Sequence, residues 1–366
     1  MIKLNVVQRW STAENPNLEL NKAFFSTLDA IQSTGLIAKA AEKLNVSYRH
    51  LWGWVSRWGI SLGSTLVLLE RGRGARLAPF GEKLLWANKR IEARLSPMLD
   101  GIASELELEL RPMVDQQGSI ARLQASHGFA VELLREAKVG RGLAHELKYV
   151  GSDAALDSLS HGESDLAGFH VPEGELQARA LAHFALWLTM PGLVLIELAY
   201  RQQGLITAVG NPKRITSVRD LTKKKVRFVN RQSGAGTRLV FDLLLAQEKL
   251  DPAGIVGYHT IEYIHSAVAA FVASDMADVG FGIETGARRF GLHFTPVLEE
   301  RYFFLCRKEL IETPRIASIL AILRDPTFQA AVNQLPGYRA VDCGKVHSIS
   351  KIFPPKNKAP SRQRQG

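Results

Sequence analysis

The 366-residue sequence predicts two architectures in series: a small helical unit ending in a strand and an arginine-rich turn, then a larger α/β region. Two observations predict the first. Residues 20–58 have helical periodicity with one break at residues 44–47, and the strand at residues 66–70 runs into Arg71, Arg73 and Arg76. The second is predicted by short apolar runs that alternate with amphipathic stretches from residue 120 onward. That alternation is typical of an α/β domain with a mostly parallel sheet.

The elements of the first unit follow from periodicity and capping residues. In chain order we expect helices at Leu20–Ser33, Ile37–Leu44 and Tyr48–Trp58, a strand at Leu66–Glu70, and a turn that carries the arginines. Ser47 is the natural N-cap of the third helix, because its hydroxyl accepts from the first free amides. Helix, helix, tight turn, helix, strand and basic turn is the order of a winged helix-turn-helix.

Basic residues are concentrated in this unit. The chain has a formal charge of +10, and residues 39–94 hold eleven Lys/Arg against four Asp/Glu. A basic run alone is usually a solvated face. Together with the order of the elements, it favours double-stranded DNA as the partner, with phosphates neutralised by lysine and arginine.

The third helix is the expected recognition helix, with its polar face in the major groove. Arg49 is the candidate for a guanine contact, since arginine pairs bidentately with guanine O6 and N7. The outward face is expected to consist of Ser47, Tyr48, Arg49, His50 and Arg57. Phosphate contacts are expected from Lys39, Lys43, Arg71, Arg73 and Arg76.

A long amphipathic helix opens at Pro79 and is expected to reach about Leu110. Its apolar stripe suits a helix–helix seam, which predicts a homodimer or homotetramer. The expected domains are 1–80 (winged helix-turn-helix), 81–119 (dimerisation helix and linker), 120–342 (effector-binding region) and 343–366, a basic tail expected to be disordered.

Candidate ligand residues lie where predicted strands end, because ligands of open α/β sheets lie off the carboxyl ends of strands. Residues 230–238 (NRQSGAGTR) follow a strand and open a helix, so free amides, hydroxyls and guanidinium groups are presented to an anion. The alternative reading of Ser152 and Asp153 is simple helix capping. For His127 it is a histidine in a surface loop, and for His170 a hydrogen-bonded hinge histidine. The full candidate set is Ser126, His127, Ser152, Asp153, His170, Arg231, Ser233, Gly234, Gly236, Thr237 and Arg238.

Two stretches carry a family resemblance. LDAIQSTGLIAKAAEKLNVSYRHLW and ERGRGARLAPFG resemble the DNA-binding domain of ModE-type regulators, which are distant kin of LysR-type winged helices. GESDLAGFHVPEG and RFVNRQSGAGTRLVFDLLL resemble the molybdate-binding-like branch of the type II periplasmic binding fold. The resemblance implies two lobes closing on a small ligand, with hinges near residues 197–204 and 294–302, and molybdate or tungstate as the effector.

Other function classes lack their motifs. The sequence contains no HExxH, no CxxC and no nucleophile elbow, so we expect no enzyme, no catalytic residues, no metal site and no cofactor. Two isolated cysteines, no signal-peptide core and no long apolar run predict a cytoplasmic protein without a membrane segment. The expected function is a one-component transcriptional regulator that senses a small anion. The alternatives are a regulator that senses a small carboxylate and a ligand-free architectural DNA-binding protein.

Overall fold

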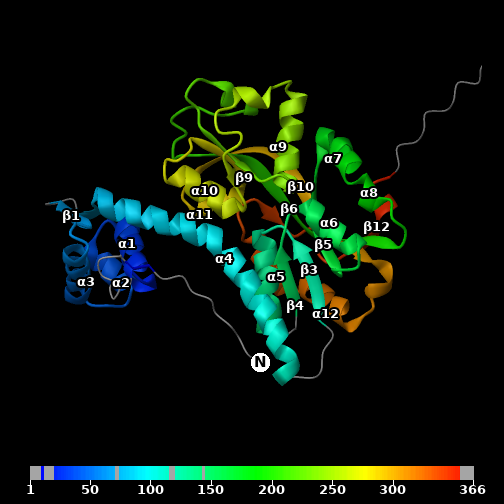
Figure 1. The fold of residues 1–366 in the computed structure, drawn as a ribbon, viewed down its shortest axis with the longest axis horizontal. Coiled ribbons are helices and arrows are strands. Elements are labelled where there is room, and N and C mark those ends of the chain that lie inside the picture. Colours follow the sequence, from blue (N-terminus) through cyan, green and yellow to red (C-terminus); the bar gives the residue numbers. More distant parts are fainter. Residues whose placement is uncertain (1–9, 12–19, 71–73, 115–119, 142–144, 355–366) are drawn as a thin grey trace, which may run out of the picture.

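The computed structural model describes residues 10–11, 20–70, 74–114, 120–141 and 145–354. Its N-terminal unit consists of three helices and a hairpin (Figure 1): α1 (Lys22–Thr34), α2 (Ile37–Lys43), α3 (Tyr48–Ser61), β1 (Val67–Glu70) and β2 (Gly74–Leu77). β1 and β2 pair antiparallel, with Val67 opposite Leu77. The predicted order of elements is therefore present in this part of the chain.

Local chemistry sets the ends of these helices. The Asn21 side chain accepts from the amides of Ala23 and Phe24 at the start of α1, and the Ser47 hydroxyl accepts from the amide of His50 at the start of α3. Gly35 ends α1 in the left-handed conformation, at φ 67°. The three helices enclose a core that includes Phe24, Phe25, Leu28, Ile31, Leu51, Val55 and Leu85.

Helix α4 (Pro79–Val114) connects the two parts of the molecule. It continues past the expected end at Leu110, so the linker that we predicted at residues 111–119 begins as helix. α4 contacts α1 in the N-terminal unit, and α10 and β4 in the α/β region (Figure 1). At its start it lies directly on the hairpin, since a Cβ at Gly81 would be 2.4 Å from the Leu66 carbonyl oxygen.

The α/β region is built on a mixed sheet rather than the mostly parallel one that we predicted. Among the described residues ten strands join it, with the main order β4-β3-β5-β10-β6-β9-β7-β8. The parallel pairs are β3 with β4 and β5, and β7 with β8 and β9, whereas β10 and β6 run antiparallel to their neighbours. The strands are β3 (Ala121–Ala125), β4 (His145–Tyr149), β5 (Leu166–Pro172), β6 (Leu193–Thr207), β7 (Phe228–Arg231), β8 (Ile261–Glu262), β9 (Val279–Ile283), β10 (His293–Arg307), β11 (Tyr338–Arg339) and β12 (Val346–Ser348).

Helices cover this sheet and connect its strands. They are α5 (Phe129–Gly140), α6 (Ser152–Ser160), α7 (Gln177–His183), α8 (Ala185–Leu188), α9 (Gly236–Gln247), α10 (His265–Ala273), α11 (Glu284–Arg289), α12 (Pro314–Leu323), α13 (Pro326–Asn333) and α14 (Ile349–Ile352), with short 3₁₀ turns at Gly174–Leu176, Val218–Thr222, Pro252–Gly254 and Lys308–Leu310.

Two long strands join two lobes. The pairing of β6 with β10 runs from Leu193 opposite Arg307 to Thr207 opposite His293. One end of β10 pairs with β5 of the first lobe, and the far end of β6 pairs with β9 of the second. The runs Leu193–Ala199 and Ile206–Val209, which we expected as separate strands, therefore belong largely to one strand, which ends at Thr207. Both expected hinge passages lie on these strands.

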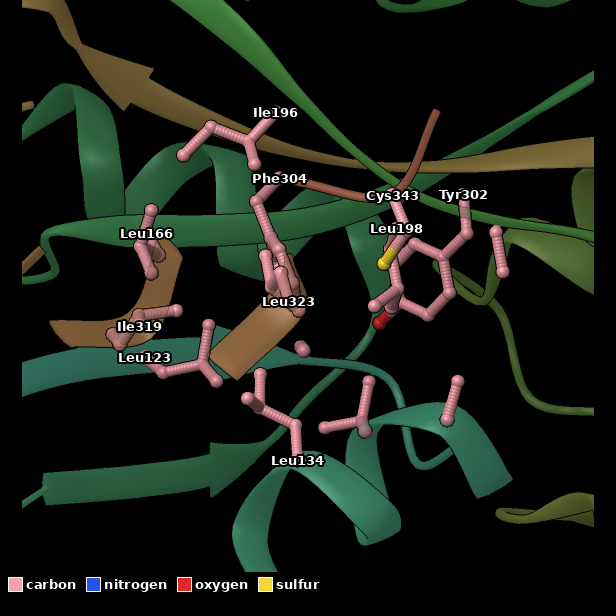
Figure 2. Close-up of a cluster of buried hydrophobic side chains, with 14 of the residues drawn as sticks. Leu123, Leu134, Leu166, Ile196, Leu198, Tyr302, Phe304, Ile319, Leu323 and Cys343 are labelled. Carbon is pink, nitrogen blue, oxygen red and sulfur yellow. The ribbon is translucent and has the colours of Figure 1, made fainter. Parts of the chain in front are cut away.

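Each lobe has its own apolar core. In the first lobe, side chains of β3, β5, β6 and β10 pack against α5, α12 and α13, as Figure 2 shows for Leu123, Leu134, Leu166, Phe304 and Leu323. In the second lobe, Phe228, Phe241 and Phe281 form the centre of another cluster. Separate cores leave the strand ends between the lobes available for polar side chains. Among the described helices, none is long and apolar enough to cross a membrane.

Candidate functional site

The candidate site is a group of buried polar side chains between the two lobes, called here the inter-lobe cluster. Its members are Ser126, His127, Ser152, His170, Arg201, Gln203, Arg231, Thr237, His265 and Glu300, all buried. The lobes touch beside it, because a Cβ at Gly151 of the first lobe would lie 2.5 Å from the Gly234 carbonyl oxygen of the second. The structure therefore shows the two lobes closed on each other.

The first lobe contributes hydroxyl and imidazole groups. Ser126 follows β3, and its hydroxyl lies 2.9 Å from Nε2 of His170 on β5. The His170 ring stacks on Tyr302 of β10, with centroids 4.1 Å apart. Ser152 begins α6, and its hydroxyl lies beside Gly236 of the second lobe, 3.1 Å from where a Cβ would stand. Glycine at 236 thus lets the two walls approach.

The hinge strands contribute a buried ion pair. Arg201 of β6 donates from Nε to the Glu300 carboxylate of β10, and both side chains are fully buried. Nε2 of Gln203 donates to the other Glu300 oxygen at 2.7 Å and also approaches the Thr237 hydroxyl at 3.2 Å. Arg201 is therefore held by its Nε, with its two terminal nitrogens directed elsewhere.

The second lobe contributes Arg231 at the end of β7. Its Nη2 donates to the Tyr263 carbonyl oxygen at 2.8 Å and its Nε to the Gln232 side chain at 3.2 Å. The ion pairs found among the described residues leave Arg231 without a carboxylate within 4.0 Å. Its register partner on β8 is Glu262, and that carboxylate instead pairs with Arg94 of α4.

Several polar groups of the cluster are left without a partner among the described residues. Within the described part of the chain, no hydrogen bond is made by either terminal nitrogen of Arg201, by Nη1 of Arg231, by the Ser152 hydroxyl, or by Nδ1 of His127, His170 and His265. Buried polar groups are almost always hydrogen-bonded. The concentration of unpaired groups in one place therefore makes the cluster a candidate binding site for an acceptor-rich molecule.

Electrostatics favour a negative ligand. Burial and the nearby Arg201 lower the pKa of Arg231 to about 9, so it remains a cation at neutral pH. Burial, then Arg231 and Arg289, lower the pKa of His127 to about 3. The pKa values of His170 and His265 fall well below the usual range, because of burial first and then of the charges on Arg201 and Arg231. The cluster thus combines neutral imidazoles with guanidinium cations.

An open groove reaches the cluster from the side of α4. It is lined by residues of α1, α4, α10 and α11, and His127 lies in its wall. Of the cluster members, His127 is the one that also lines this groove.

The structure brings together most, but not all, of the predicted ligand residues. Those in the cluster or its wall are Ser126, His127, Ser152, His170, Arg231, Gly236 and Thr237. Asp153 instead pairs with His183 at 2.9 Å, Ser233 is exposed, and Gly234 forms the positive-φ turn that meets Gly151. Arg238 is also directed away, because both of its contacts to Asp242 come from Nε (2.8 and 2.9 Å) and Nη1 donates to the Arg231 carbonyl oxygen.

Sequence reasoning missed the hinge-strand residues of the cluster, which are Arg201, Gln203 and Glu300. Their signal was present as charged and amide side chains within 15-residue strands that are otherwise largely apolar and buried. A buried charge needs a partner or a function, and on this ground Arg201 is a candidate ligand-binding residue. Among the described residues no group of three or more His, Cys, Asp or Glu is arranged to hold a metal ion.

The N-terminal unit presents its predicted basic residues to solvent. Tyr48, Arg49, His50 and Arg57 of α3 are exposed, as are Lys39 and Lys43 of α2. Arg76 of β2 is exposed and pairs with Glu70, so part of its charge is neutralised. Arg71 and Arg73, predicted to contact phosphates, lie outside the described residues, as do residues 355–366 of the predicted tail. The first half of that tail is folded, not disordered as we predicted: β12 pairs with β6, α14 follows, and Cys343 and Phe353 are buried in the apolar cores.

Comparison with known proteins identifies the family. A model described as a PBP superfamily domain matches residues 132–324, more than half of the chain. The chain belongs to the PBP superfamily. The matched residues of this PBP-superfamily chain include most of the inter-lobe cluster.

Individual relatives are distant. The uncharacterized protein YvgK of Bacillus subtilis is 31% identical over 199 residues, which are 54% of this chain and 64% of YvgK, so this chain spans less than two thirds of that relative. Molybdenum-pterin-binding protein MopB of Rhodobacter capsulatus is 28% identical over 203 residues, 54% of this chain and 67% of MopB. Full-length HypT of Salmonella typhimurium, a hypochlorite-specific LysR-type transcriptional regulator, is 15% identical, with a TM-score of 0.44 over 85% of this chain and 99% of HypT. The homologues and neighbours with a stated role are binding proteins or regulators, not enzymes.

The three buried histidines predict sensitivity to acid. Their folded-state pKa values lie below the unfolded value near 6.5, so below that pH the unfolded chain binds protons that the folded chain excludes. What the neutral histidines contribute to the free energy of unfolding is fully present above about pH 6.5. It falls on acidification by about 1.4 kcal/mol per pH unit for each histidine. Thermal unfolding midpoints between pH 7.5 and 5 measure this, and His265→Gln is expected to flatten the fall by about a third. A midpoint that stays constant over this range contradicts the assignment.

Proposed function

We propose that this PBP-superfamily chain is a one-component transcriptional regulator that binds operator DNA with its N-terminal unit and senses a small anion between its lobes. The observation that carries the proposal is the set of unpaired guanidinium nitrogens buried in the inter-lobe cluster. An anion supplies the acceptors and the negative charge that these groups lack. A regulator of DNA acts in the cytoplasm, which is where we place it.

The N-terminal unit supports the DNA-binding half of the proposal. Its two helices, turn, third helix and hairpin occur in the order expected of a winged helix-turn-helix of the ModE and LysR type, which supports this role. α3 is anchored by Leu51 and Val55, which are buried, and it presents Arg49 and Arg57 to solvent. A basic helix backed by an apolar face is what insertion into the major groove requires.

Helix α4 supports a homodimer, with a homotetramer as the higher assembly. Met98, Ile102 and Leu106 are spaced by four residues, and they are 62%, 46% and 39% exposed. Residues four apart lie on one helix face, so these three form an apolar stripe open to a second copy of the helix. A symmetric pair of N-terminal units would read a palindromic operator.

For the effector we propose molybdate or tungstate first, since the relative MopB is named for binding molybdenum-pterin. Small carboxylates are the second choice, because carboxylate oxygens also accept bidentately from arginine. Screening the full-length chain by thermal shift against molybdate, tungstate, sulfate, phosphate and small carboxylates separates them, because a ligand that binds only the folded state raises the midpoint. If no anion shifts the midpoint while DNA binding persists, the chain is an architectural DNA-binding protein.

The DNA-binding role is tested with Arg49→Ala. A duplex selected from a random pool by the wild-type chain is the probe, and titration by fluorescence anisotropy is the measurement. We expect the variant to lose about 1–3 kcal/mol of affinity for this duplex and to discriminate less against base changes in it. Arg179→Ala removes an exposed arginine of α7 and serves as the control that binds as wild type. Unchanged affinity and unchanged discrimination for Arg49→Ala contradict the recognition-helix assignment.

A further inference from the structure

The inter-lobe cluster contains three ionised side chains that face one another. Arg201 and Arg231 are cations, and Glu300 is an anion that accepts from Arg201 and Gln203. The carboxylate therefore cancels one guanidinium charge. One net positive charge remains, and it resides on Arg231, which is 2% exposed.

The ion pairs around these three leave the sum unchanged, and Arg135, a cation that is not a member of the cluster, has a partner of its own. Glu262 is 2% exposed and pairs with Arg94 of α4, so this pair is neutral. On the hinge, Glu197 and Arg301 form a second neutral pair at 2.5 Å. The uncharged groups that complete the surroundings are His127, His170, His265, Tyr302 and Tyr338, while Arg135 and Arg289 approach His127 from α5 and α11. Arg289 is itself paired with Glu132 at the rim.

We propose that the cluster accommodates one net negative ligand charge, and that Glu300 is the residue that sets this limit. The proposal rests on the anion-sensing function above and names its ligand class. Monoanions, such as a small monocarboxylate or a singly charged oxyanion, match the site directly. A dianion such as molybdate binds only together with one proton taken from solvent, held by the oxyanion or by a cluster histidine.

The physical reason is the low polarity of a closed site. Charges a few ångströms apart interact several times more strongly at the lower effective dielectric constant of a protein than in water, so an uncompensated charge is costly. A bare dianion would leave the cluster with an excess negative charge beside Glu300. Burial and the nearby arginines hold the three imidazoles neutral in the free cluster. A bound dianion opposes the effect of the arginines, so it favours uptake of the proton by an imidazole, whose Nδ1 lacks a partner among the described residues, or by the oxyanion itself.

The matched variant is Glu300→Gln, which removes the charge and keeps the shape. The new amide oxygen can accept from Nε of Arg201. Its amide nitrogen can donate to Oε1 of Gln203, which has no partner within the described chain, once the Gln203 amide turns over. With Glu300 neutral the cluster carries two net positive charges and takes a dianion without a proton. Glu299→Gln is the control, because Glu299 lies on the same strand but pairs with Arg339 at the surface.

Isothermal titration calorimetry of the full-length chain at pH 7.5, in HEPES and in Tris, measures the protons taken up on binding. For the wild type we expect about zero protons with acetate, formate or nitrate, and about one with molybdate, tungstate or sulfate. Glu300→Gln is expected to bind these dianions about tenfold more tightly without proton uptake, and Glu299→Gln is expected to behave as wild type.

Two results overturn the inference in distinguishable ways. A dianion that binds the wild-type chain without proton uptake refutes the one-charge limit and leaves the anion-sensing function intact. No heat and no thermal stabilisation with any of the six anions, in wild type or variant, refutes the anion-sensing function and the inference with it. The wild-type proton count is decisive by itself if Glu300→Gln does not fold.

Discussion

Arg231→Met is expected to remove the response of the inter-lobe cluster to anions while leaving the fold intact. Of the two guanidinium groups in the cluster, the substitution deletes the one whose charge no carboxylate of the described ion pairs balances, together with an unpaired Nη1 donor. Charge-assisted hydrogen bonds are worth about 1.5–3 kcal/mol each, so we expect affinity for the best anion to fall about 100-fold. Calorimetry or thermal shift measures the loss.

The stability of the same variant separates binding from folding. Arg231 and Arg201 repel each other, and burial adds to the cost of their charges. Replacing one of them with an apolar side chain of similar length is therefore expected to leave the ligand-free unfolding midpoint unchanged or raised. Arg238→Met, in the first turn of α9, is the control. Asp242 engages the Arg238 guanidinium, so anion binding should persist. Normal anion affinity in Arg231→Met contradicts the site.

Arg94→Ala is expected to disconnect the N-terminal unit from the inter-lobe cluster. Arg94 of α4 makes a bidentate contact with Glu262, which is buried and stands beside Arg231 in the sheet register. Without Arg94, the Glu262 carboxylate loses its ion pair, and its negative charge then acts on Arg231, its register partner, and offsets the cation that the anion needs. We expect anion affinity to fall about tenfold, equivalent to about 1.4 kcal/mol. We also expect anion-dependent changes in DNA affinity to disappear.

Two further variants test that explanation. Arg94→Lys keeps the positive charge on α4 and should restore most of the anion affinity, whereas Arg90→Ala, one turn earlier on the helix, should behave as wild type. If Arg94→Ala binds anions and DNA with unchanged coupling, the contact between α4 and β8 is structural only.

Local sequence signals predicted the strand-end residues of the site well. Ser126, His170 and Arg231 each lie at the end of an apolar run. β3, which is parallel to β4, and β7, which is parallel to β9, bring two of these ends to the space between the lobes. Rules of local chemistry are sufficient there, because a strand end and the following turn lie within a few residues of each other. The caps at Ser47 and the core positions Leu51 and Val55 were predictable for the same reason.

Other features depended on partners far away in the chain. Arg201 and Glu300 are 99 residues apart and meet only because β6 and β10 pair antiparallel, which the apolar pattern of neither strand specifies. Polar residues inside β6 made one strand resemble two. Arg231 ends β7 and Arg238 lies in the first turn of α9, on either side of one short connection, and the pairing of Arg238 with Asp242, one helical turn later, holds its guanidinium away from the cluster.

The most direct test of the regulator is the affinity of the full-length chain for its selected DNA duplex, measured by fluorescence anisotropy with and without the anion that stabilises it most. A ligand shifts an equilibrium only through its different affinities for two states, so the expected coupling is a 5- to 150-fold change in DNA affinity, about 1–3 kcal/mol. We expect that change in the wild type and none in Arg231→Met. Equal DNA affinity with and without a saturating anion in the wild type would contradict the account.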